Sequence, residues 1–372
     1  MTKPMKHLCI ISLGSNQGDK LQYLQSGIKR LMQTLGPLER LSPIYETQAL
    51  GFSGDDFYNA CASFRTSLAP QYVMEQLLSI EQEHGRERSK GGIYSSRTLD
   101  LDLLFYDELQ IDTATLILPH PRLHQRNFVL QPLADIHPDQ YHPVLDQSVA
   151  KLQLVSPDES ALKRLPYHQW TPPIFDNHPQ LVIEGNIGSG KTTLTEMIAN
   201  HYGVKGLYEA FQKNPHLTNF YSDPKTHALA VEKFFLNDRF KQLQNFEVET
   251  QGKSTVADYG MHKSLVFARV NLSRGFRAYR REFRKRQKQL RFISLWVYLH
   301  RPLEELILQI EERGRSFEQD ISPQYLKQLE DSYTQFIREE APFPVLEIDA
   351  QGIDFPGDEE AFHRLLLRIF GR

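Results

Sequence analysis

The sequence predicts two domains of different class, a small α+β sandwich followed by an α/β domain with a parallel sheet. Strand and helix patterns alternate over the first part of the chain, and a polar, proline-rich stretch from Leu154 to Gln180 then interrupts them. A complete phosphate-binding loop, Glu184–Thr193, begins only after that stretch. Because such a loop joins the first strand of its domain to the first helix, a whole domain precedes it. The predicted borders are 1–161 for the first domain, 162–179 for a linker and 180–372 for the second domain.

The composition is that of an ordinary globular protein. The chain has 372 residues, of which 40% are hydrophobic and 24% charged, so either domain can bury a core. The formal net charge of -3 creates no global field for nucleic acid or a membrane. Cys9 and Cys61 lie in apolar, strand-like runs, so we expect buried, reduced thiols. No signal peptide or apolar run of about 20 residues is recognisable, and we expect a cytoplasmic protein.

The first domain shows the two periodicities of strands and helices. Between Leu21 and Leu35 apolar residues recur at helical spacing. A strand from His7 to Leu13 precedes this helix and ends in a turn at Gly14-Ser15-Asn16. The further expected elements are strands at Asn59–Thr66 and Thr98–Tyr106 and a helix at Pro70–His84.

Two carboxylates share one face of the predicted strand around residue 100. Alternate side chains of a strand share a face, so Leu99, Leu101 and Leu103 would pack inward while Asp100 and Asp102 point together to the other side. Close carboxylates repel each other unless a cation lies between them, and Mg²⁺ suits such oxygen ligands. A solvated face of an edge strand would show the same alternation.

The run from Arg97 to Asp102, Arg-Thr-Leu-Asp-Leu-Asp, resembles the hallmark of the hydroxymethyldihydropterin pyrophosphokinases. The resemblance covers about Lys6 to Ala161 and implies a ferredoxin-like α+β fold. It also implies transfer of the β,γ-diphosphate of ATP to the 6-hydroxymethyl group of a pterin, with Mg²⁺ and release of AMP. Further matching segments are Leu13–Asn16, Tyr45–Thr47, Leu50–Phe52, Gly85–Arg88, Pro119–Arg122 and Gln125–Phe128.

The same resemblance implies roles for individual residues of the first domain. The catalytic residues would be Arg86, Arg97, Asp100 and Asp102, and the two aspartates would bind Mg²⁺. The ATP-binding residues would be Glu81, Arg88, His120 and Arg126. The pterin-binding residues would be Thr47, Leu50, Phe57, Asn59, Tyr94 and Phe128. Two positions depart from the family pattern, because Gln48 replaces a proline and Tyr94 a tryptophan.

The loop of the second domain fits G-x-x-x-x-G-K-[ST] from Gly185 to Thr192. Its glycines let successive backbone N–H groups point at phosphate oxygens, and the next helix adds its positive end. Lys191 would neutralise the β- and γ-phosphates, and the Thr192 hydroxyl would hold Mg²⁺. The predicted ATP-binding residues here are Gly185, Asn186, Ile187, Gly188, Ser189, Gly190, Lys191, Thr192 and Thr193.

Residues 180–372 resemble the deoxynucleoside kinases, which carry nearly the same loop. The resemblance implies that Glu209 accepts the proton of the 5′-hydroxyl as it attacks the γ-phosphate, although a lone glutamate here could also be a surface residue. The expected catalytic residues are Lys191, Glu209, Arg239, Arg313 and Arg315. The expected nucleoside-binding residues are Tyr221, Glu232, Arg239 and Glu318.

Two positions of the second domain depart from its family. The triplet Asp258-Tyr259-Gly260 lacks the arginine of the family's Asp-Arg-Ser, but Asp258 remains a candidate Mg²⁺ ligand. Glu232 stands where the family reads the base with a glutamine. An ionised carboxylate only accepts hydrogen bonds. It could take two from guanine but only one kind from adenine, unless it holds a proton. We expect a purine deoxynucleoside, without a choice between adenine and guanine.

The sequence therefore predicts a bifunctional, Mg²⁺-dependent kinase. Its partners would be ATP, hydroxymethyldihydropterin and a deoxynucleoside, with no nucleic acid and no membrane. The resemblance also implies a homodimer through the second domain. Two alternatives remain: a second domain that only binds nucleotide or dimerises, and a nucleic-acid patch in the basic run Arg274–Arg291. For that run we prefer a solvated helix face that packs through Phe276 and Phe283.

Overall fold

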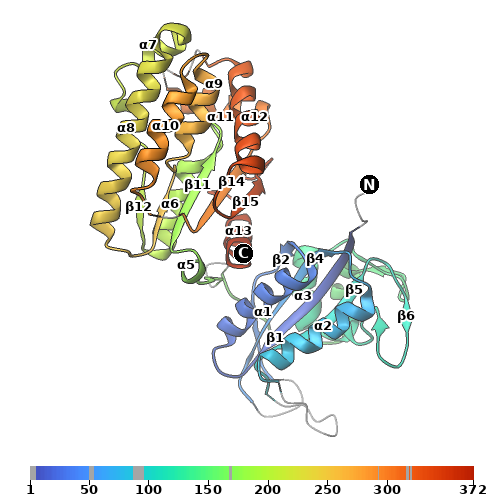
Figure 1. The fold of residues 1–372 in the computed structure, drawn as a ribbon. Helices are drawn as coiled ribbons and strands as arrows, with labels where there is room; N and C mark the ends of the chain where they lie inside the picture. The colour runs from blue at the N-terminus through green and yellow to red at the C-terminus, as the bar shows by residue number, and fades with distance from the viewer. Residues whose placement is uncertain are drawn as a thin grey trace. The chain divides into compact units, whose positions relative to one another are not determined.

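The computed structural model describes residues 6–49, 54–86, 96–166, 170–291, 293–315, 318 and 321–372, without the side chains of Thr218, Tyr221 and Ser222. Its internal contacts form two compact units (Figure 1). The first unit comprises Met1–Pro173 together with Gly357–Arg372, and the second comprises Ile174–Pro356. Among the described residues, no helix is long and apolar enough to cross a membrane.

The first unit is built on a six-stranded antiparallel sheet with the order β10-β3-β4-β1-β5, in which β2 also pairs with β4. The strands are β1 (His7–Ser15), β2 (Leu38–Leu41), β3 (Tyr45–Thr47), β4 (Phe57–Thr66), β5 (Asp100–Tyr106) and β10 (Lys163–Arg164). The helices are α1 (Lys20–Leu35), α2 (Pro70–Glu83), α3 (Asn127–Ile136) and α4 (Val149–Leu154). Short hairpins pair β6 (Ile111–Asp112) with β7 (Ile117–Leu118) and β8 (Tyr141–His142) with β9 (Gln147–Ser148).

Both faces of this sheet are covered by helices. Along β1, Cys9 and Ile11 join a core with residues of α1 and α2, whereas Ile10 joins a second core with residues of α3 and α4. This alternation follows from the two-residue period of a strand. Cys9 and Cys61 are free and buried, as predicted, and burial raises the pKa of both thiols. The antiparallel sheet agrees with the predicted α+β class, and the ferredoxin-like assignment stays a prediction.

The first unit extends beyond the border predicted for the first domain. The predicted linker 162–179 contains β10, which pairs with β3, and Trp170, which is fully buried in the core of the first unit. The Trp170 indole N–H donates to the carbonyl oxygen of Ser42 at 3.3 Å. A two-residue strand is too short to leave a periodic signal, and the prolines around it favoured a linker.

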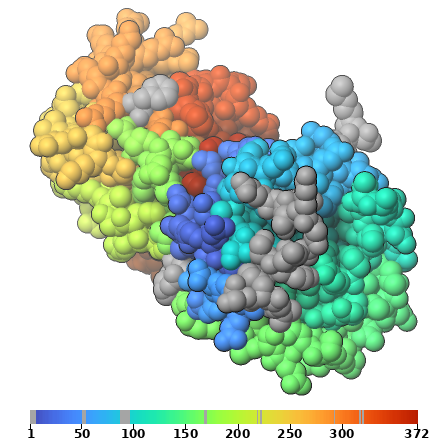
Figure 2. All heavy atoms as spheres, turned by 90° about the horizontal axis from the view of Figure 1, so that it is seen from below, coloured from blue at the N-terminus to red at the C-terminus, as the bar shows by residue number. Residues whose placement is uncertain are grey.

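The last helix, α13 (Glu359–Phe370), also packs in the first unit, although the predicted border placed residues 180–372 in the second domain. Leu367 is buried in the core that α1 and α2 form with the sheet. The Lys29 ammonium lies 4.6 Å from the ring centre of Phe370, and Arg364 donates to the carbonyl oxygen of Glu39 at 3.3 Å. Segments far apart in sequence thus lie side by side in this unit, and Figure 2 shows early residues in blue beside residues after 100 in teal.

The second unit contains a five-stranded parallel sheet, as predicted, with the order β12-β13-β11-β14-β15. The strands are β11 (Gln180–Gly185), β12 (Lys205–Leu207), β13 (Thr255–Ala257), β14 (Leu295–His300) and β15 (Val345–Asp349). The helices are α5 (Ile174–Asn177), α6 (Lys191–Tyr202), α7 (Leu217–Ser222), α8 (Pro224–Thr250), α9 (Lys263–Asn271), α10 (Phe276–Gln287), α11 (Leu303–Arg313) and α12 (Pro323–Glu339).

This topology brings three predicted site segments to one edge of the parallel sheet. The phosphate-binding loop follows β11, Glu209 follows β12, and Asp258 follows β13. The carboxyl ends of adjacent parallel strands share an edge, where such sheets bind ligands. The basic run forms α10, which buries Tyr279 and Phe283 and leaves arginines such as Arg281 exposed, as expected for a solvated helix face.

Candidate active sites

The first unit contains a cavity of about 390 Å³ beside β5. It gathers most of the residues that the sequence predicted for the pterin and diphosphate chemistry. The lining residues are Ser12, Gly14, Thr47, Gln48, Phe57, Asn59, Arg86, Arg97, Asp100, Asp102, Arg122, Gln125, Arg126 and Phe128. The predicted residues Leu50, Arg88 and Tyr94 lie outside the described part of the chain.

The two aspartates of β5 face this cavity, while Leu101 and Leu103 between and beyond them are buried in the core. Two arginines hold the Asp100 carboxylate: Arg97 donates to Oδ2 at 2.6 Å, and Arg86 Nη1 lies 2.6 Å from Oδ1. The predicted catalytic residues of the first unit therefore do come together.

Nearby cations compensate the negative charge of Asp102 less well than that of Asp100. Burial and the charge of Asp100 raise the pKa of Asp102. The nearest cations are Arg126, whose Nη1 lies 3.8 Å from Oδ2, and His120, whose Nε2 lies 3.9 Å from the same oxygen. Burial lowers the pKa of His120, so its ring is a poor source of positive charge. Two close carboxylates with incomplete compensation form a donor set that suits Mg²⁺ together with phosphate oxygens.

Glu81, predicted to bind ATP, does not line the cavity. Its carboxylate is 2% exposed, accepts the backbone N–H of Leu101 at 2.8 Å and pairs with Arg86. Glu81 on α2 thus joins the start of β5 to the arginine that reaches Asp100. This arrangement indicates a positioning role, which the sequence did not reveal because the contact joins two separate elements.

Gly14, Thr47 and Asn59 form another part of the cavity lining, and the last two were predicted to bind the pterin ring. Asn59 donates to the Thr47 hydroxyl at 2.8 Å, and both residues are buried. A Cβ at Gly14 would lie 3.3 Å from Asn59 Oδ1 and 3.7 Å from the Phe57 ring, so glycine keeps this end open. Ser12 also lines the cavity, and the sequence reasoning missed it. Its position opposite Asp102 in the β1–β5 register could have indicated it.

The second unit contains a cavity of about 140 Å³ at the carboxyl edge of its sheet. The lining residues are Ile187, Gly188, Lys191, Thr192, Tyr208, Glu209, Phe211, Leu217, Phe220, Val231, Glu232, Phe235, Arg239, Asp258, Lys263, Phe267, Asn271, Arg313, Arg315, Glu318 and Tyr325. Of the predicted nucleoside-binding residues, only the Tyr221 side chain lies outside the description.

The phosphate-binding loop has the backbone that its glycines allow. Gly188 has a φ of +85°, and a Cβ there would lie 2.8 Å from the carbonyl oxygen of Leu306. The Lys191 ammonium donates to the carbonyl oxygen of Asn186 at 2.7 Å. Burial lowers the pKa of Lys191 to about 8, and the neighbouring charge of Lys263 acts in the same direction. An anionic phosphate would stabilise the charged form of this lysine.

Asp258 connects the loop to the predicted base. Its Oδ2 accepts the Thr192 hydroxyl at 2.7 Å, and its Oδ1 accepts the backbone N–H of Glu209 at 2.8 Å. Burial raises the pKa of Asp258. The hydroxyl and carboxylate oxygens form a hard donor pair at the phosphate end, so Thr192 and Asp258 fit the predicted Mg²⁺ site. Among the described residues, no group of three or more histidine, cysteine, aspartate or glutamate side chains could hold a metal ion.

The Glu209 carboxylate is only 13% exposed and is paired with two cations, unlike a surface glutamate. Arg239 donates to its Oε1 at 2.7 Å, and Lys263 donates to its Oε2 at 2.6 Å. Burial opposes the charge of Glu209, but Lys263 and Arg239 outweigh it and lower the pKa to about 2. Sequence reasoning missed Lys263, which begins α9. It supplies a cation in a site whose third-strand triplet lacks the family's arginine.

The predicted residues Arg313, Arg315 and Glu318 also line this cavity. Arg313 Nε donates to Glu318 Oε2 at 3.0 Å, and Arg315 Nη1 donates to Glu318 Oε1 at 3.4 Å. The Arg315 guanidinium lies 4.2 Å from the ring centre of Phe211. Both arginines pair with Glu318 yet stay partly exposed, so their guanidinium groups remain accessible to a phosphate.

Glu232 of α8 also lines this cavity. It is 1% exposed, and Asn271 donates to its Oε1 at 2.6 Å. The Tyr279 hydroxyl lies 3.4 Å from its Oε2. Burial raises the pKa of Glu232 to about 7. The aromatic rings that line the cavity are Phe211, Phe220, Phe235, Phe267 and Tyr325.

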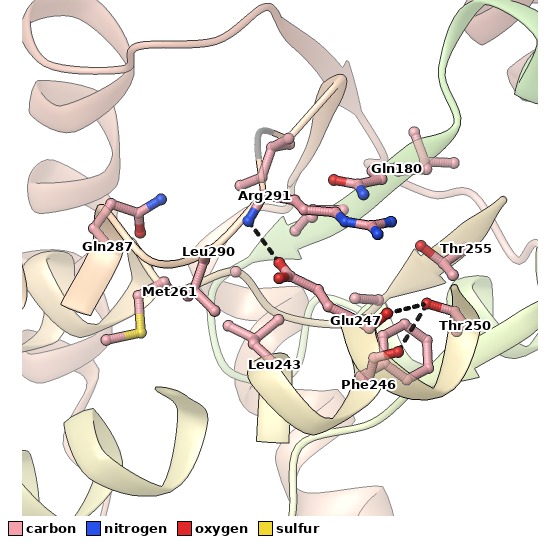
Figure 3. A pocket seen from close by; sticks show the side chains of 15 residues that line it. Gln180, Leu243, Phe246, Glu247, Thr250, Thr255, Met261, Gln287, Leu290 and Arg291 are labelled. Carbon is pink, nitrogen blue, oxygen red and sulfur yellow. Dashed lines mark hydrogen bonds between the residues drawn. The ribbon is translucent and has the colours of Figure 1, made fainter. Parts of the chain in front are cut away.

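A third cavity, of about 60 Å³, lies at the amino ends of β11 and β13 (Figure 3). Glu247 accepts the backbone N–H of Arg291 at 2.7 Å, and the Thr250 hydroxyl donates to the carbonyl oxygen of Phe246 at 2.8 Å. None of the predicted site residues lines this cavity, so we place the chemistry in the two cavities described above.

Comparisons with known proteins identify one family for each part of the chain. A family model described as 7,8-dihydro-6-hydroxymethylpterin-pyrophosphokinase matches residues 10–138, and one described as deoxynucleoside kinase matches residues 181–370. The chain belongs to both families. Its first part is 40% identical over 147 residues to a 2-amino-4-hydroxy-6-hydroxymethyldihydropteridine pyrophosphokinase of Synechocystis sp., a match that covers 39% of this chain and 74% of the relative.

The second part is similar to nucleoside kinases. It is 32% identical over 198 residues to a deoxyguanosine kinase of Bacillus subtilis, and this match covers 51% of this chain and 96% of the relative. A solved deoxyadenosine kinase structure from M. mycoides with bound dATP is 22% identical, with a TM-score of 0.44, over 50% of this chain and 97% of that one. The chain thus combines a pterin pyrophosphokinase domain with a deoxynucleoside kinase domain.

Proposed function

We propose that this chain is a bifunctional ATP-dependent kinase. The first site transfers diphosphate from ATP to 6-hydroxymethyl-7,8-dihydropterin, and the second transfers the γ-phosphate of ATP to the 5′-hydroxyl of a purine deoxynucleoside. The observation that carries the proposal is that two separate cavities each combine phosphate-binding cations, carboxylates and a pocket for a ring. In this proposal residues 1–161 and 180–372 supply the two activities.

In the first reaction the pterin hydroxymethyl oxygen attacks the β-phosphorus of ATP, and AMP leaves. Asp100 and Asp102 would hold Mg²⁺, which screens the charge of the triphosphate. Arg86 and Arg97 lie on Asp100 and would stabilise the negative charge that develops at the β-phosphorus. The Thr47–Asn59 pair would bind the edge of the pterin ring.

In the second reaction the 5′-hydroxyl oxygen attacks the γ-phosphorus, and ADP leaves. Glu209 is ionised, as a proton acceptor must be, and it lies in the same cavity as the phosphate loop. Lys191, Arg313 and Arg315 would hold the transferring phosphoryl group, and Thr192 with Asp258 would hold Mg²⁺. Glu232 and the aromatic rings would bind the base.

Two further parts of the proposal rest on the sequence alone. The homodimer through the second domain is implied by the resemblance to deoxynucleoside kinases, and the cytoplasmic location is the expectation drawn in the sequence analysis. Sedimentation of the purified protein would test the first of these.

One observation favours a second candidate function. Tyr259 stands where the family carries an arginine, so the second domain could bind nucleotide without transferring phosphate. The position of Lys263 on Glu209 argues against this alternative, because it supplies a cation within the same cavity.

Radiolabelled ATP tests the proposal directly. The full-length protein is incubated with Mg²⁺, ATP labelled at the γ-phosphate and each of the four common deoxynucleosides in turn, with Lys191→Ala as control. We expect label in a purine deoxynucleoside monophosphate, and none with the control. If no deoxynucleoside is labelled while the pterin reaction proceeds, the kinase assignment fails and the nucleotide-binding alternative takes its place.

A further inference from the structure

Glu232 is a buried acid that lines the proposed base pocket, and its two hydrogen-bond partners do not use all of its acceptor positions. Asn271 and Tyr279 each bond one of its two carboxyl oxygens. A carboxylate has about four acceptor positions, two on each oxygen, so each oxygen keeps one position for another donor. The base of a bound nucleoside can therefore meet both oxygens.

The groups that shift the pKa of Glu232 come from α8, α9, α10 and the segment after β12. Arg239 of α8 is the cation near it, but its Nε bonds Glu209 and its Nη1 bonds Ser264 of α9 at 2.9 Å. Burial raises the pKa of Glu232. Arg239, Asn271 of α9 and Tyr279 of α10 lower it in part, and the charge of Glu209 after β12 raises it again. With a pKa of about 7, the protonated and ionised forms are both present near neutral pH.

The two forms of the side chain offer different hydrogen-bond patterns. The ionised carboxylate presents two acceptors side by side. Guanine presents two neighbouring donors, its N1–H and its 2-amino group. The neutral acid presents one donor and one acceptor. Adenine offers the matching pair, N1 as acceptor and the 6-amino group as donor.

We propose that Glu232 selects the purine by its protonation state, so that the ionised form accepts deoxyguanosine and the neutral form accepts deoxyadenosine. This proposal rests on the phosphoryl transfer proposed above for the second site. One pocket then serves both nucleosides, and pH sets the ratio at which it uses them. Asn271 is a positioning residue, because its amide holds Oε1 in either form.

The proposal has a quantitative signature. The pH dependence of kcat/KM reflects ionisation of the free enzyme. The value for each nucleoside is therefore proportional to the fraction of free enzyme whose Glu232 is in the form that this nucleoside requires. The ratio of kcat/KM for deoxyguanosine to that for deoxyadenosine then follows the ratio of ionised to neutral Glu232. It rises about tenfold per pH unit, and all other ionisations that affect both reactions cancel.

The test uses the full-length protein and both nucleosides from about pH 6 to about pH 8, on either side of the pKa of Glu232. We expect the ratio to rise about 100-fold across this range. Glu232→Gln keeps the shape, offers one donor and one acceptor and does not titrate, so its ratio should be constant. Glu339→Gln, an exposed change on α12, should keep the slope of the unchanged protein.

The outcomes separate this proposal from the function on which it rests. A constant ratio in the unchanged protein, with both nucleosides phosphorylated, overturns the role of Glu232 and leaves the kinase assignment standing. If the ratio still rises with pH in Glu232→Gln, the role of Glu232 is likewise overturned and the kinase assignment stands. If neither nucleoside is phosphorylated at any pH, both proposals fall. If Glu232→Gln does not fold, the pH profile of the unchanged protein decides alone.

Discussion

In the first unit Asp100 and Asp102 share one face of an antiparallel strand, and nearby cations only partly compensate the charge of Asp102. In the second unit Glu209 lies between two cations. Burial and Asp100 raise the pKa of Asp102, while Lys263 and Arg239 overcome burial and lower the pKa of Glu209 to about 2. The difference matches the two roles proposed above. A pair of metal-binding carboxylates is stabilised when a divalent cation binds, because the cation removes their mutual repulsion. A proton acceptor has to be ionised before its substrate binds.

The largest expected effect separates the two sites. Asp102→Asn removes one charge of the strand pair and should lower the rate of the pterin reaction about 1,000-fold, because the protein loses an Mg²⁺ ligand. It should leave deoxynucleoside phosphorylation within about twofold. Both rates are measured on one preparation. An equal loss of both would contradict the assignment of Asp102 to a separate site.

A smaller effect is expected at the cation that the sequence did not reveal. Lys263→Ala should lower kcat for the deoxynucleoside about 100-fold, because the Glu209 carboxylate loses the hydrogen bond that positions it and the proposed phosphoryl site loses a positive neighbour. Lys263→Arg should restore much of the rate, since arginine keeps the charge. The comparison of the two variants by steady-state kinetics, with the pterin reaction as internal control, distinguishes charge from packing. Equal rates for Lys263→Ala and Lys263→Arg would contradict a role for the positive charge at this position.

The last helix gives a prediction about stability. Leu367→Ala in α13 should destabilise the first unit by about 2 kcal/mol, since it leaves a hole in a fully buried position of that unit's core. Chemical denaturation followed through the pterin activity and through the nucleoside activity would report the two units separately. A loss of stability confined to the nucleoside activity would contradict the placement of α13. Leu308→Ala, at an exposed position of α11, serves as the control.

The smallest effect concerns the pterin pocket. Thr47→Ala removes the hydroxyl that Asn59 bonds and should raise KM for the pterin up to about tenfold, with little change in kcat. A fall in kcat with an unchanged KM would indicate that the pair acts in the transition state and not in binding. Thr47→Ser is the matched variant, because it keeps the hydroxyl.

Sequence reasoning reached the parts of both sites that are local in the chain. The phosphate loop and the alternation of Asp100 and Asp102 depend on a few consecutive residues, and the structure places both as expected. The parts that it missed depend on packing between distant elements. Lys263 meets Glu209 only because β12 and β13 are neighbours in the sheet. Asn271 meets Glu232 only because α9 packs against α8.

The unit borders show the same limit. Trp170 stands among prolines that favour a linker, yet its ring fills the core of the first unit. Leu367 belongs to a helix whose apolar spacing shows that it packs, but that spacing does not show against which sheet it packs. Such contacts have long sequence separations, so no local pattern predicts them.

The central claim is that one chain carries two independent phosphate-transfer sites, and the products of ATP distinguish them. AMP forms only when diphosphate is transferred, and ADP forms when the γ-phosphate is transferred. The most direct measurement supplies hydroxymethyldihydropterin and a purine deoxynucleoside together and quantifies AMP and ADP for Asp102→Asn and Lys191→Ala. We predict that the first variant makes ADP without AMP and the second makes AMP without ADP. Loss of both products in either variant would contradict two independent sites.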